Sequence, residues 1–192
     1  MRTSQSTFSP LKTVTLLLVL GIVTGCRGAK GPELGAESPS ILLTTAAFHD
    51  GDRIPGSYTC DGANTSPALT WSDPPSATKS FALVMDDPDA PMGSFVHWVI
   101  YNLPASTRTL PAAEPTQAQL SDGSLQGKND FPGAGYGGPC PPGHSEHHYR
   151  FILYAVDTVL PLPSGATKEQ VEDALKGHIV ARGKLVGRYS RP

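Results

Sequence analysis

The chain has 192 residues, of which 15 are Lys or Arg and 17 are Asp or Glu, so its formal net charge is −2. The basic residues form no block, and this excludes the electrostatic footprint that nucleic-acid binding requires. The length suits one domain with a full hydrophobic core behind an N-terminal leader, and no internal repeat or second domain boundary is visible.

The N-terminal residues predict export and anchoring. Arg2 and Lys12 give a positively charged start, and the apolar run of residues 14–23 is shorter than the roughly 20 residues of a spanning helix. Small residues then precede Cys26, which resembles a bacterial lipoprotein signal. We therefore predict a signal peptide over residues 1–25, lipidation of Cys26, and an exported, membrane-anchored lipoprotein that faces the periplasm or the cell surface. An ordinary secretory signal peptide and a retained anchor are the alternatives.

Residues 26–40 are rich in Gly, Pro and Ser, which is typical of a flexible tether. Residues 41–192 follow as one folded domain, with short apolar runs between Pro and Gly. This pattern favours antiparallel strands with few helices, and so a mostly β, sandwich-like fold. Residues 81–85 are all apolar, which predicts a strand covered on both faces. The predicted strands are residues 41–48, 68–71, 80–86, 96–102, 148–157 and 185–190.

One helix is predicted near the C-terminus. Thr167 and Gln170 have the spacing of a capping box, in which each side chain bonds the backbone N–H of the other residue. Gly183 is the predicted terminator. The residues that follow the cap at helical spacing are Val171, Leu175, His178 and Ile179.

A rigid acidic turn follows the buried strand. Its sequence is Asp87-Pro88-Asp89-Ala90-Pro91, and the two prolines restrict the backbone. A stiff turn holds a carboxylate in one orientation, as a binding pocket requires. An acidic surface turn is the simpler alternative, and Asp89 in particular can cap the turn through its own backbone.

Histidines mark two more segments. His97 alternates with Val99 and Tyr101 on a predicted strand, so we place the three on one face and Trp98 on the opposite, core face. The second segment is the Gly-Pro-rich run of residues 137–143, which leads into a His-His-Tyr strand. Between the two segments, residues 104–132 have little periodicity, and we predict an extended surface crossover bordering a binding site.

Within the second strand, His147 and Tyr149 share one face and His148 takes the other. The two neighbouring histidines therefore cannot share a metal as a helical pair does, and we predict no metal site. No Gly-x-Ser-x-Gly motif is present. We accordingly predict no catalytic residue and no cofactor.

The acidic turn, the histidine strand and the Gly-Pro-x-Pro-Pro run before His-x-Tyr occur in an order that resembles the phosphatidylethanolamine-binding protein family, in its bacterial Raf-kinase-inhibitor-like branch. The resemblance covers about residues 41–191. It implies a large antiparallel core sheet, a smaller second sheet and a few peripheral helices. It also implies a ligand pocket formed by Asp87, Asp89, His97, Gly138, Pro139, Pro141, His147 and Tyr149.

The chain departs from the family at one position of this pocket strand. His148 stands where the family usually has an arginine that we expect to brace the aspartate turn, and Arg150 follows two residues later. The departure puts the brace in question and leaves the pocket in place. His148 is then a candidate partner for Asp89 or Asp87, with a strength that depends on pH near neutrality.

Two cysteines, Cys60 and Cys140, remain if Cys26 is lipidated. Each lies in a loop that we place near the pocket, and an even number of cysteines in an oxidising compartment is compatible with a disulfide. Two free thiols are the alternative, because sequence does not give the separation of the two residues.

These residues predict a non-enzymatic binding protein for a small anion such as phosphate or a phospholipid headgroup. Imidazolium and phenol groups are good donors to phosphate oxygens. Kinase regulation rests on family analogy alone, because an exported protein does not meet the cytosolic kinases of its own cell. One alternative is an inhibitor or interaction module that binds a protease or another protein through the Pro-rich rim. The other is a hydrolase that uses Asp/His acid–base chemistry.

Overall fold

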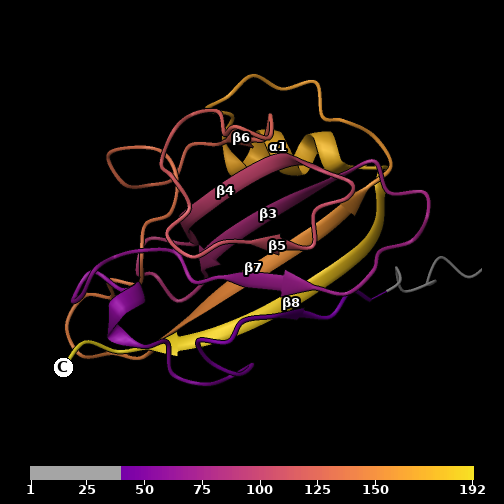
Figure 1. The fold of residues 1–192 in the computed structure, drawn as a ribbon. Coiled ribbons are helices and arrows are strands. Elements are labelled where there is room, and N and C mark those ends of the chain that lie inside the picture. Colours follow the sequence, from indigo (N-terminus) through magenta and orange to yellow (C-terminus); the bar gives the residue numbers. More distant parts are fainter. Residues whose placement is uncertain (1–39) are drawn as a thin grey trace, which may run out of the picture. The chain divides into compact units, whose positions relative to one another are not determined.

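A computed structural model describes residues 40–192 (Figure 1). The predicted signal peptide, the predicted lipidation site Cys26 and residues 26–39 of the predicted tether lie outside the described residues. The fold is mostly antiparallel β with two sheets, as the sequence predicts. The elements are β1 (Leu43–Thr44), η1 (Gly56–Tyr58), β2 (Leu69–Trp71), β3 (Ser80–Asp87), β4 (Phe95–Pro104), β5 (Thr109–Leu110), β6 (Leu125–Gln126), β7 (His147–Val156), α1 (Lys168–Leu175) and β8 (Ile179–Tyr189).

The large sheet has the strand order β6-β4-β3-β7-β8, and the small sheet has the order β1-β2-β5. The central strand β3 pairs with β4 on one side and β7 on the other, so every one of its residues is buried. This explains the uninterrupted apolar run of residues 81–85, because a strand covered on both faces shows no polar alternation. The predicted central strand is confirmed.

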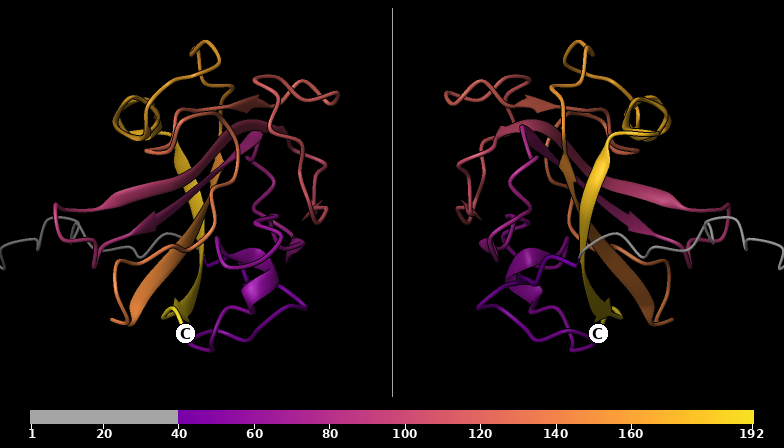
Figure 2. Two further views of the ribbon diagram at one scale, coloured as in Figure 1. Left: turned by 90° about the vertical axis from the view of Figure 1, so that its left-hand side faces the viewer. Right: turned by 90° about the vertical axis from the view of Figure 1, so that its right-hand side faces the viewer.

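Two hydrophobic cores lie on opposite faces of the large sheet. On one face, Trp71 and Leu69 of the small sheet pack with Phe81 and Leu83 of β3. On the other face, α1 packs against Val84 and its neighbours. The side views in Figure 2 show α1 and the indigo-to-purple N-terminal segment on either side of the large sheet. No helix within residues 40–192 is long and apolar enough to cross a membrane.

The helix begins as predicted and ends earlier. Thr167 caps it, and Gln170 returns the bond to the Thr167 backbone, so the capping box is present. Val171 and Leu175 are buried, and each full burial is worth about 2 kcal/mol. The prediction that His178 and Ile179 continue the helix is wrong, because Gly177 takes a left-handed φ of 80° and Ile179 starts β8.

Gly183 therefore does not terminate the helix; it lies inside β8, where the Ile41 carbonyl approaches so closely that a side chain would not fit. β8 starts at Ile179, six residues before the predicted strand. Conversely, the predicted strand at residues 41–48 shrinks to Leu43–Thr44. Ile41 and Phe48 are buried in the core without belonging to a strand.

The segment of residues 104–132 is less of a surface crossover than predicted. It contains β5 and β6, and Gln126 is fully buried. The Gln126 side-chain oxygen accepts a hydrogen bond of 2.7 Å from the indole N–H of Trp98. This bond links the crossover to the core beside the site.

Candidate functional site

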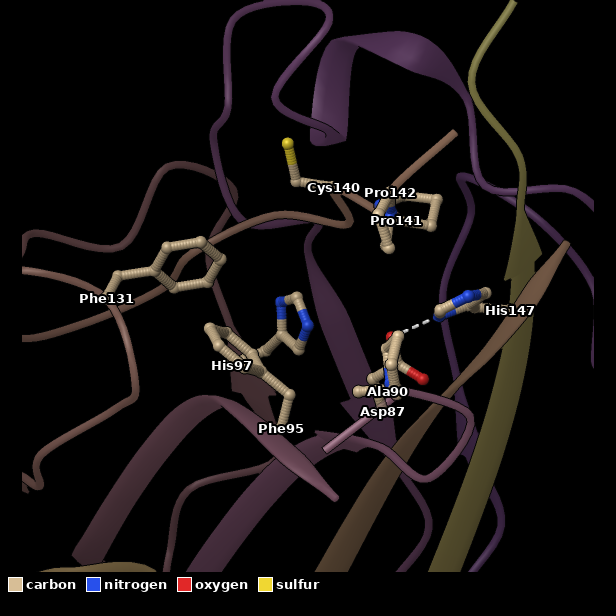
Figure 3. A pocket seen from close by; sticks show the side chains of 10 residues that line it. Asp87, Ala90, Phe95, His97, Phe131, Cys140, Pro141, Pro142 and His147 are labelled. Atoms are coloured by element: carbon tan, nitrogen blue, oxygen red, sulfur yellow. Dashed lines mark hydrogen bonds and ion pairs between the residues drawn. The ribbon is translucent and has the colours of Figure 1, made fainter. Parts of the chain in front are cut away.

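A small cavity of about 140 Å³ lies where β3, β4 and β7 present their ends to the loops (Figure 3). Its polar wall comes from a carboxylate and two imidazoles, and the remainder is largely apolar. Drug-sized pockets usually have 300–1,000 Å³, so this cavity suits a small group rather than an acyl chain. The lining residues are Asp87, Ala90, Pro91, Phe95, His97, Phe131, Cys140, Pro141, Pro142 and His147.

Asp87 is the last residue of β3, and its carboxylate is buried with both oxygens engaged. Oδ1 accepts the backbone N–H of Asp89 at 2.9 Å, which is the local bond that an aspartate makes in a Pro-fixed turn. Oδ2 lies 2.8 Å from Nδ1 of His147 on β7. The carboxylate therefore fixes both the shape of the turn and the orientation of the His147 ring.

A β-bulge brings His97 to the cavity. Met85 of β3 pairs with Trp98 and the next residue, Asp86, pairs with Val96, so His97 is the extra residue of β4. An extra residue breaks the two-residue alternation of a strand. The prediction that His97 shares a face with Val99 and Tyr101 is therefore wrong: the bulge turns its ring to the pocket side.

The His97 ring is enclosed by aromatic side chains and held by one backbone carbonyl. Phe95, Phe131 and Tyr149 lie with ring centroids 5.1 to 5.3 Å from it. Nδ1 lies 2.6 Å from the Gly137 carbonyl oxygen and donates to it. Burial is the main effect and lowers the His97 pKa below its usual value, although the bond to Gly137 acts in the opposite direction. His97 is therefore mainly neutral at pH 7, with Nε2 as an acceptor.

Tyr149 lies behind this wall rather than on it. Its side chain is fully buried, edge-on to the His97 ring, and its hydroxyl has no hydrogen-bond partner among residues 40–192. Burial, followed by the charge of Asp87, raises the Tyr149 pKa well above its usual value. Tyr149 therefore supports the pocket as a neutral phenol and does not line the cavity.

Asp89 and His148 form a separate pair outside the cavity. One carboxylate oxygen of Asp89 accepts from the His148 backbone N–H at 2.8 Å and lies 2.7 Å from its Nδ1. The hydrogen bonds from the His148 side chain and backbone lower the Asp89 pKa. Of the two carboxylates considered as partners for His148, the structure places Asp89 beside it.

Arg150 does not brace the aspartate turn at Asp87. It bonds Asp86 with its Nε at 2.8 Å and its Nη2 at 2.7 Å, and Lys168 of α1 adds a third contact at 2.5 Å. Burial acts to raise the Asp86 pKa, but the hydrogen bonds from Arg150 and Lys168 outweigh it and lower the pKa. Asp86, Arg150 and Lys168 lie on the face of the large sheet that packs against α1.

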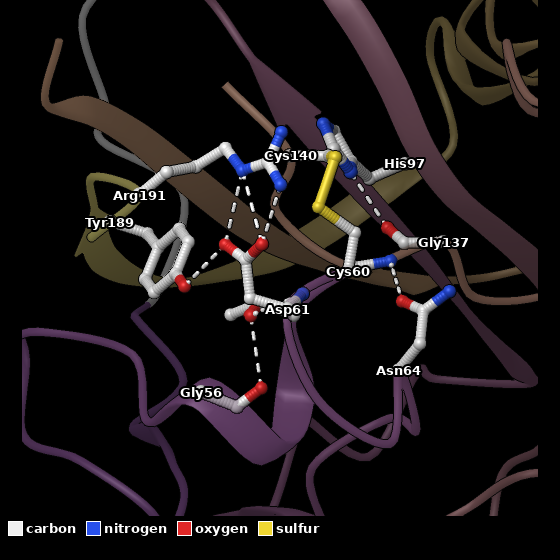
Figure 4. The surroundings of a disulfide bond; sticks show 11 residues. Gly56, Cys60, Asp61, Asn64, His97, Gly137, Cys140, Tyr189 and Arg191 are labelled. Carbon is white, nitrogen blue, oxygen red and sulfur yellow. Dashed lines mark hydrogen bonds and ion pairs between the residues drawn. A yellow bond between two sulfur atoms is a disulfide. The ribbon is translucent and has the colours of Figure 1, made fainter. Parts of the chain in front are cut away.

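A disulfide forms part of the pocket rim (Figure 4). Cys60 and Cys140 are bonded, with their Cα atoms 5.4 Å apart. Gly138 and Pro139 are buried behind the rim: the Gly138 N–H donates to Asn64 and the Pro139 carbonyl accepts from the Cys60 N–H. These two predicted pocket residues hold the rim in place and do not line the cavity.

The structure thus brings Asp87, His97, Pro141 and His147 together around one cavity. It places Asp89, Gly138, Pro139 and Tyr149 outside the cavity wall. Sequence reasoning did not single out Phe95 and Phe131, which form the aromatic side of the pocket. The only signal for Phe95 is its position two residues before His97, and Phe131 lies in the crossover that was expected to border the site.

No group of three or more His, Cys, Asp or Glu side chains within residues 40–192 could hold a metal ion. The cavity instead offers three groups whose hydrogen-bonding capacity depends on protonation. Asp87 accepts, and each histidine keeps one ring nitrogen for a ligand, as an acceptor when neutral and a donor when protonated. The arrangement can recognise a small group that carries negative charge or both charges.

The sequence pattern of phosphatidylethanolamine-binding proteins matches residues 44–190. The chain belongs to this family. The family resemblance seen in the sequence is therefore confirmed, and it supports a protein of the binding type.

Relatives within the family align over most of their length. A UPF0098 protein of Methanothermobacter thermautotrophicus is 51% identical over 149 residues, which are 78% of this chain and 98% of the relative. The UPF0098 protein YbcL of Escherichia coli is 35% identical over 189 residues, which are 93% and 98% of the two chains. The similarity to YbcL places this chain in the YbcL-like branch of the family.

Two solved structures of family members share the fold. The crystal structure of a phosphatidylethanolamine-binding protein homologue from Chlamydia trachomatis has a TM-score of 0.72 and 39% identity, with 81% of this chain and 100% of that chain covered. The structure of Escherichia coli YbcL has a TM-score of 0.71 and 35% identity, with 80% and 99% covered.

Proposed function

We propose that the protein is a non-enzymatic binding protein whose cavity takes a small anionic group, such as phosphate or a phospholipid headgroup. The observation that carries the proposal is the pair of histidines, His97 and His147, on the wall of a cavity of about 140 Å³. Each has one ring nitrogen committed to the protein and the other without a partner among residues 40–192.

Protonation of the histidines is the physical basis for anion binding. Within residues 40–192 no Lys or Arg lines the cavity, and Asp87 repels a second negative charge. A bound anion therefore favours the imidazolium forms, which donate charge-assisted hydrogen bonds. Burial lowers the pKa of His97 in the free protein, so binding of an anion takes up a proton there and the affinity for phosphate rises as the pH falls.

The same carboxylate makes a zwitterionic headgroup a better ligand than phosphate alone. The family takes its name from phosphatidylethanolamine, whose headgroup carries a phosphate and an amine. In this pocket the amine would bond Asp87 and the phosphate would bond the histidines. Phosphoethanolamine is therefore expected to bind more tightly than phosphate, and ethanolamine more weakly than either.

A calorimetric titration tests the proposal. The full-length protein is titrated with phosphate, phosphoethanolamine and ethanolamine at pH 6 and pH 8, in a polyoxyethylene detergent that carries neither phosphate nor amine. His147→Gln is expected to weaken phosphate binding at least tenfold. His148→Gln is the matched control, because this neighbour is exposed on the other face and bonds Asp89.

Absence of saturable binding at millimolar phosphoester would overturn the anion pocket. Turnover of the same phosphoesters would instead show a hydrolase in which Asp87 orients His147 as a general base. Both outcomes are read from one sample, because the calorimetric samples are then assayed for released phosphate.

An interaction module for a protein partner is the second candidate, favoured by the apolar surface at the cavity mouth. Met92 is fully exposed on the turn that carries Ala90 and Pro91, and Pro142 is exposed on the disulfide-bearing rim. Substitution of Met92 and Pro142 by Ser would then reduce capture of a partner protein, while His147→Gln would not.

A further inference from the structure

A second cleft lies directly beside the pocket and shares Phe131 with it. Its volume is about 560 Å³, against about 140 Å³ for the pocket. The residues that matter for its chemistry are Asn64, Thr116, Asn129, Phe131, Tyr136 and Gly137. None of the eight residues that the sequence predicts for the pocket lines this cleft. The cleft is therefore separate from the predicted site.

Gly137 lines the cleft and is in contact with His97, which lines the pocket. On the pocket side, the Gly137 carbonyl accepts from His97. On the cleft side, the N–H of the next residue, Gly138, donates to Asn64 Oδ1 at 2.8 Å. Figure 4 shows Gly137 between His97 and Asn64. A side chain on Gly137 would overlap the Phe131 ring, so the close approach requires glycine.

The cleft differs from the pocket in charge, because no ionised side chain of residues 40–192 lines it. Tyr136 is a titratable residue in its wall; the Tyr136 hydroxyl donates to the Tyr58 carbonyl at 2.6 Å, and burial raises the Tyr136 pKa well above the usual value. The Asn129 amide bonds the protein on both sides: it donates to the carbonyls of Gly135 and His97 and accepts from the Phe131 N–H.

Two polar groups in the cleft remain for a ligand. The Asn64 side-chain N–H₂ and the Thr116 hydroxyl are exposed at the cleft and make no hydrogen bond within residues 40–192. The amide donates, and the hydroxyl both donates and accepts. Neutral groups of this kind match the hydroxyls of a polyol or sugar better than a second charge.

We propose that the cleft is a second subsite, which binds the uncharged, hydroxyl-bearing part of a phosphate ester whose phosphate lies in the pocket. The inference rests on the proposed anion pocket and names its ligand class. Such an ester crosses the exposed side of Phe131, which lines both cavities. It comes either from a lipid headgroup or from a soluble metabolite, and both present the same chemistry.

Matched ligands and a matched variant pair test the proposal on the full-length protein. Glycerol 3-phosphate and n-propyl phosphate have the same charge and chain length and differ in two hydroxyls. Thr116→Trp fills the cleft from an exposed position, and Thr116→Ser keeps the hydroxyl. Vesicles of phosphatidylcholine with and without phosphatidylglycerol form a second arm that separates a lipid source from a soluble one.

Wild type and Thr116→Ser are expected to bind glycerol 3-phosphate roughly tenfold more tightly than propyl phosphate, as two hydrogen bonds provide. Thr116→Trp should lose this preference and keep its affinity for inorganic phosphate. Equal binding of the two esters by wild type, or a preference that survives in Thr116→Trp, would overturn the subsite. The anion pocket would still be supported in that case if inorganic phosphate binds. Failure of inorganic phosphate itself to bind would overturn both.

Discussion

Asp86 and Asp87 are consecutive residues of β3, yet they face opposite sides of the large sheet and have opposite electrostatic surroundings. Asp86 is bonded by Arg150, Lys168 and the Ser94 hydroxyl. Asp87 is bonded by the His147 ring and by the backbone N–H of Asp89. The strand alternation thus separates a carboxylate neutralised by fixed cations from one whose partner is a titratable ring.

Asp86→Asn is expected to destabilise the protein by about 3 kcal/mol, because it leaves Arg150 and Lys168 beside a neutral group at a buried position. Asp87→Asn breaks one side-chain hydrogen bond and leaves no Lys or Arg unpaired, so a loss of about 1 kcal/mol in the free energy of unfolding is expected. Urea unfolding at pH 7 measures both. Equal losses would show that the two carboxylates contribute equally to the free energy of unfolding.

The Asp86 pKa also predicts how stability depends on acid. Because the folded-state pKa is lowered, the stabilisation is complete above the unfolded value of about 4 and disappears as the pH falls through the folded value. The gap in unfolding free energy between wild type and Asp86→Asn should therefore narrow below pH 4. A gap that stays constant down to pH 2 contradicts the assignment.

His97 is expected to change the stability of the protein over a different range of pH. Its folded-state pKa is lowered by burial, so the unfolded chain binds more protons and the protein loses stability as the pH falls below about 6.5. His97→Gln should show a flatter stability profile between pH 7 and pH 5. Under the proposed function, phosphate should restore part of the wild-type stability at pH 5 and have a smaller effect in the variant.

Tyr149 and Tyr136, which are both buried, should respond in opposite ways to removal of their hydroxyls. Tyr149→Phe removes a buried hydroxyl that has no partner, and a gain of about 1 kcal/mol is expected. Tyr136→Phe removes a hydroxyl that donates to the Tyr58 carbonyl, and a loss of about 1 kcal/mol is expected. Thermal unfolding of the pair measures the difference, and a loss of stability in Tyr149→Phe would reveal a partner for its hydroxyl.

The disulfide should stabilise both the fold and the pocket rim. It joins residues 80 apart in sequence, and removal of such a bridge typically costs about 2–4 kcal/mol. The Cys60→Ser, Cys140→Ser double variant should lose this amount, and phosphate should bind it more weakly because Cys140 lines the cavity. Chemical denaturation with and without phosphate separates the two effects. Unchanged affinity would show that the backbone bonds alone position the rim.

Much of the fold follows from local patterns in the sequence, and the errors have physical causes. The apolar residues of β3 and the capping box of α1 predict their elements because each pattern is sufficient by itself. The end of α1 is not predictable in the same way, since Gly177 and Gly183 are equivalent stop signals and apolar spacing continues through Ile179. In the structure Gly177 takes the left-handed conformation that ends the helix, and Gly183 packs against Ile41 inside β8.

The candidate site is also predictable from the sequence only in part. Asp87 and His147 are predictable because a rigid turn and a strand alternation set their directions. Phe131 is not, because a lone aromatic residue in an aperiodic segment does not indicate where the segment folds. The orientation of His97 is also hidden from sequence, since periodicity does not show where a strand carries an extra residue.

That extra residue makes the pocket depend on the length of β4 as well as on its residue types. Loss of one residue between Val96 and Trp98 would let β3 and β4 pair in continuous register past Met85. The apolar core would remain complete, and the pocket would lose one of its two imidazoles. A family member can therefore retain a stable fold and abandon this mode of recognition by a single deletion, without any substitution in the remaining residues of the cavity.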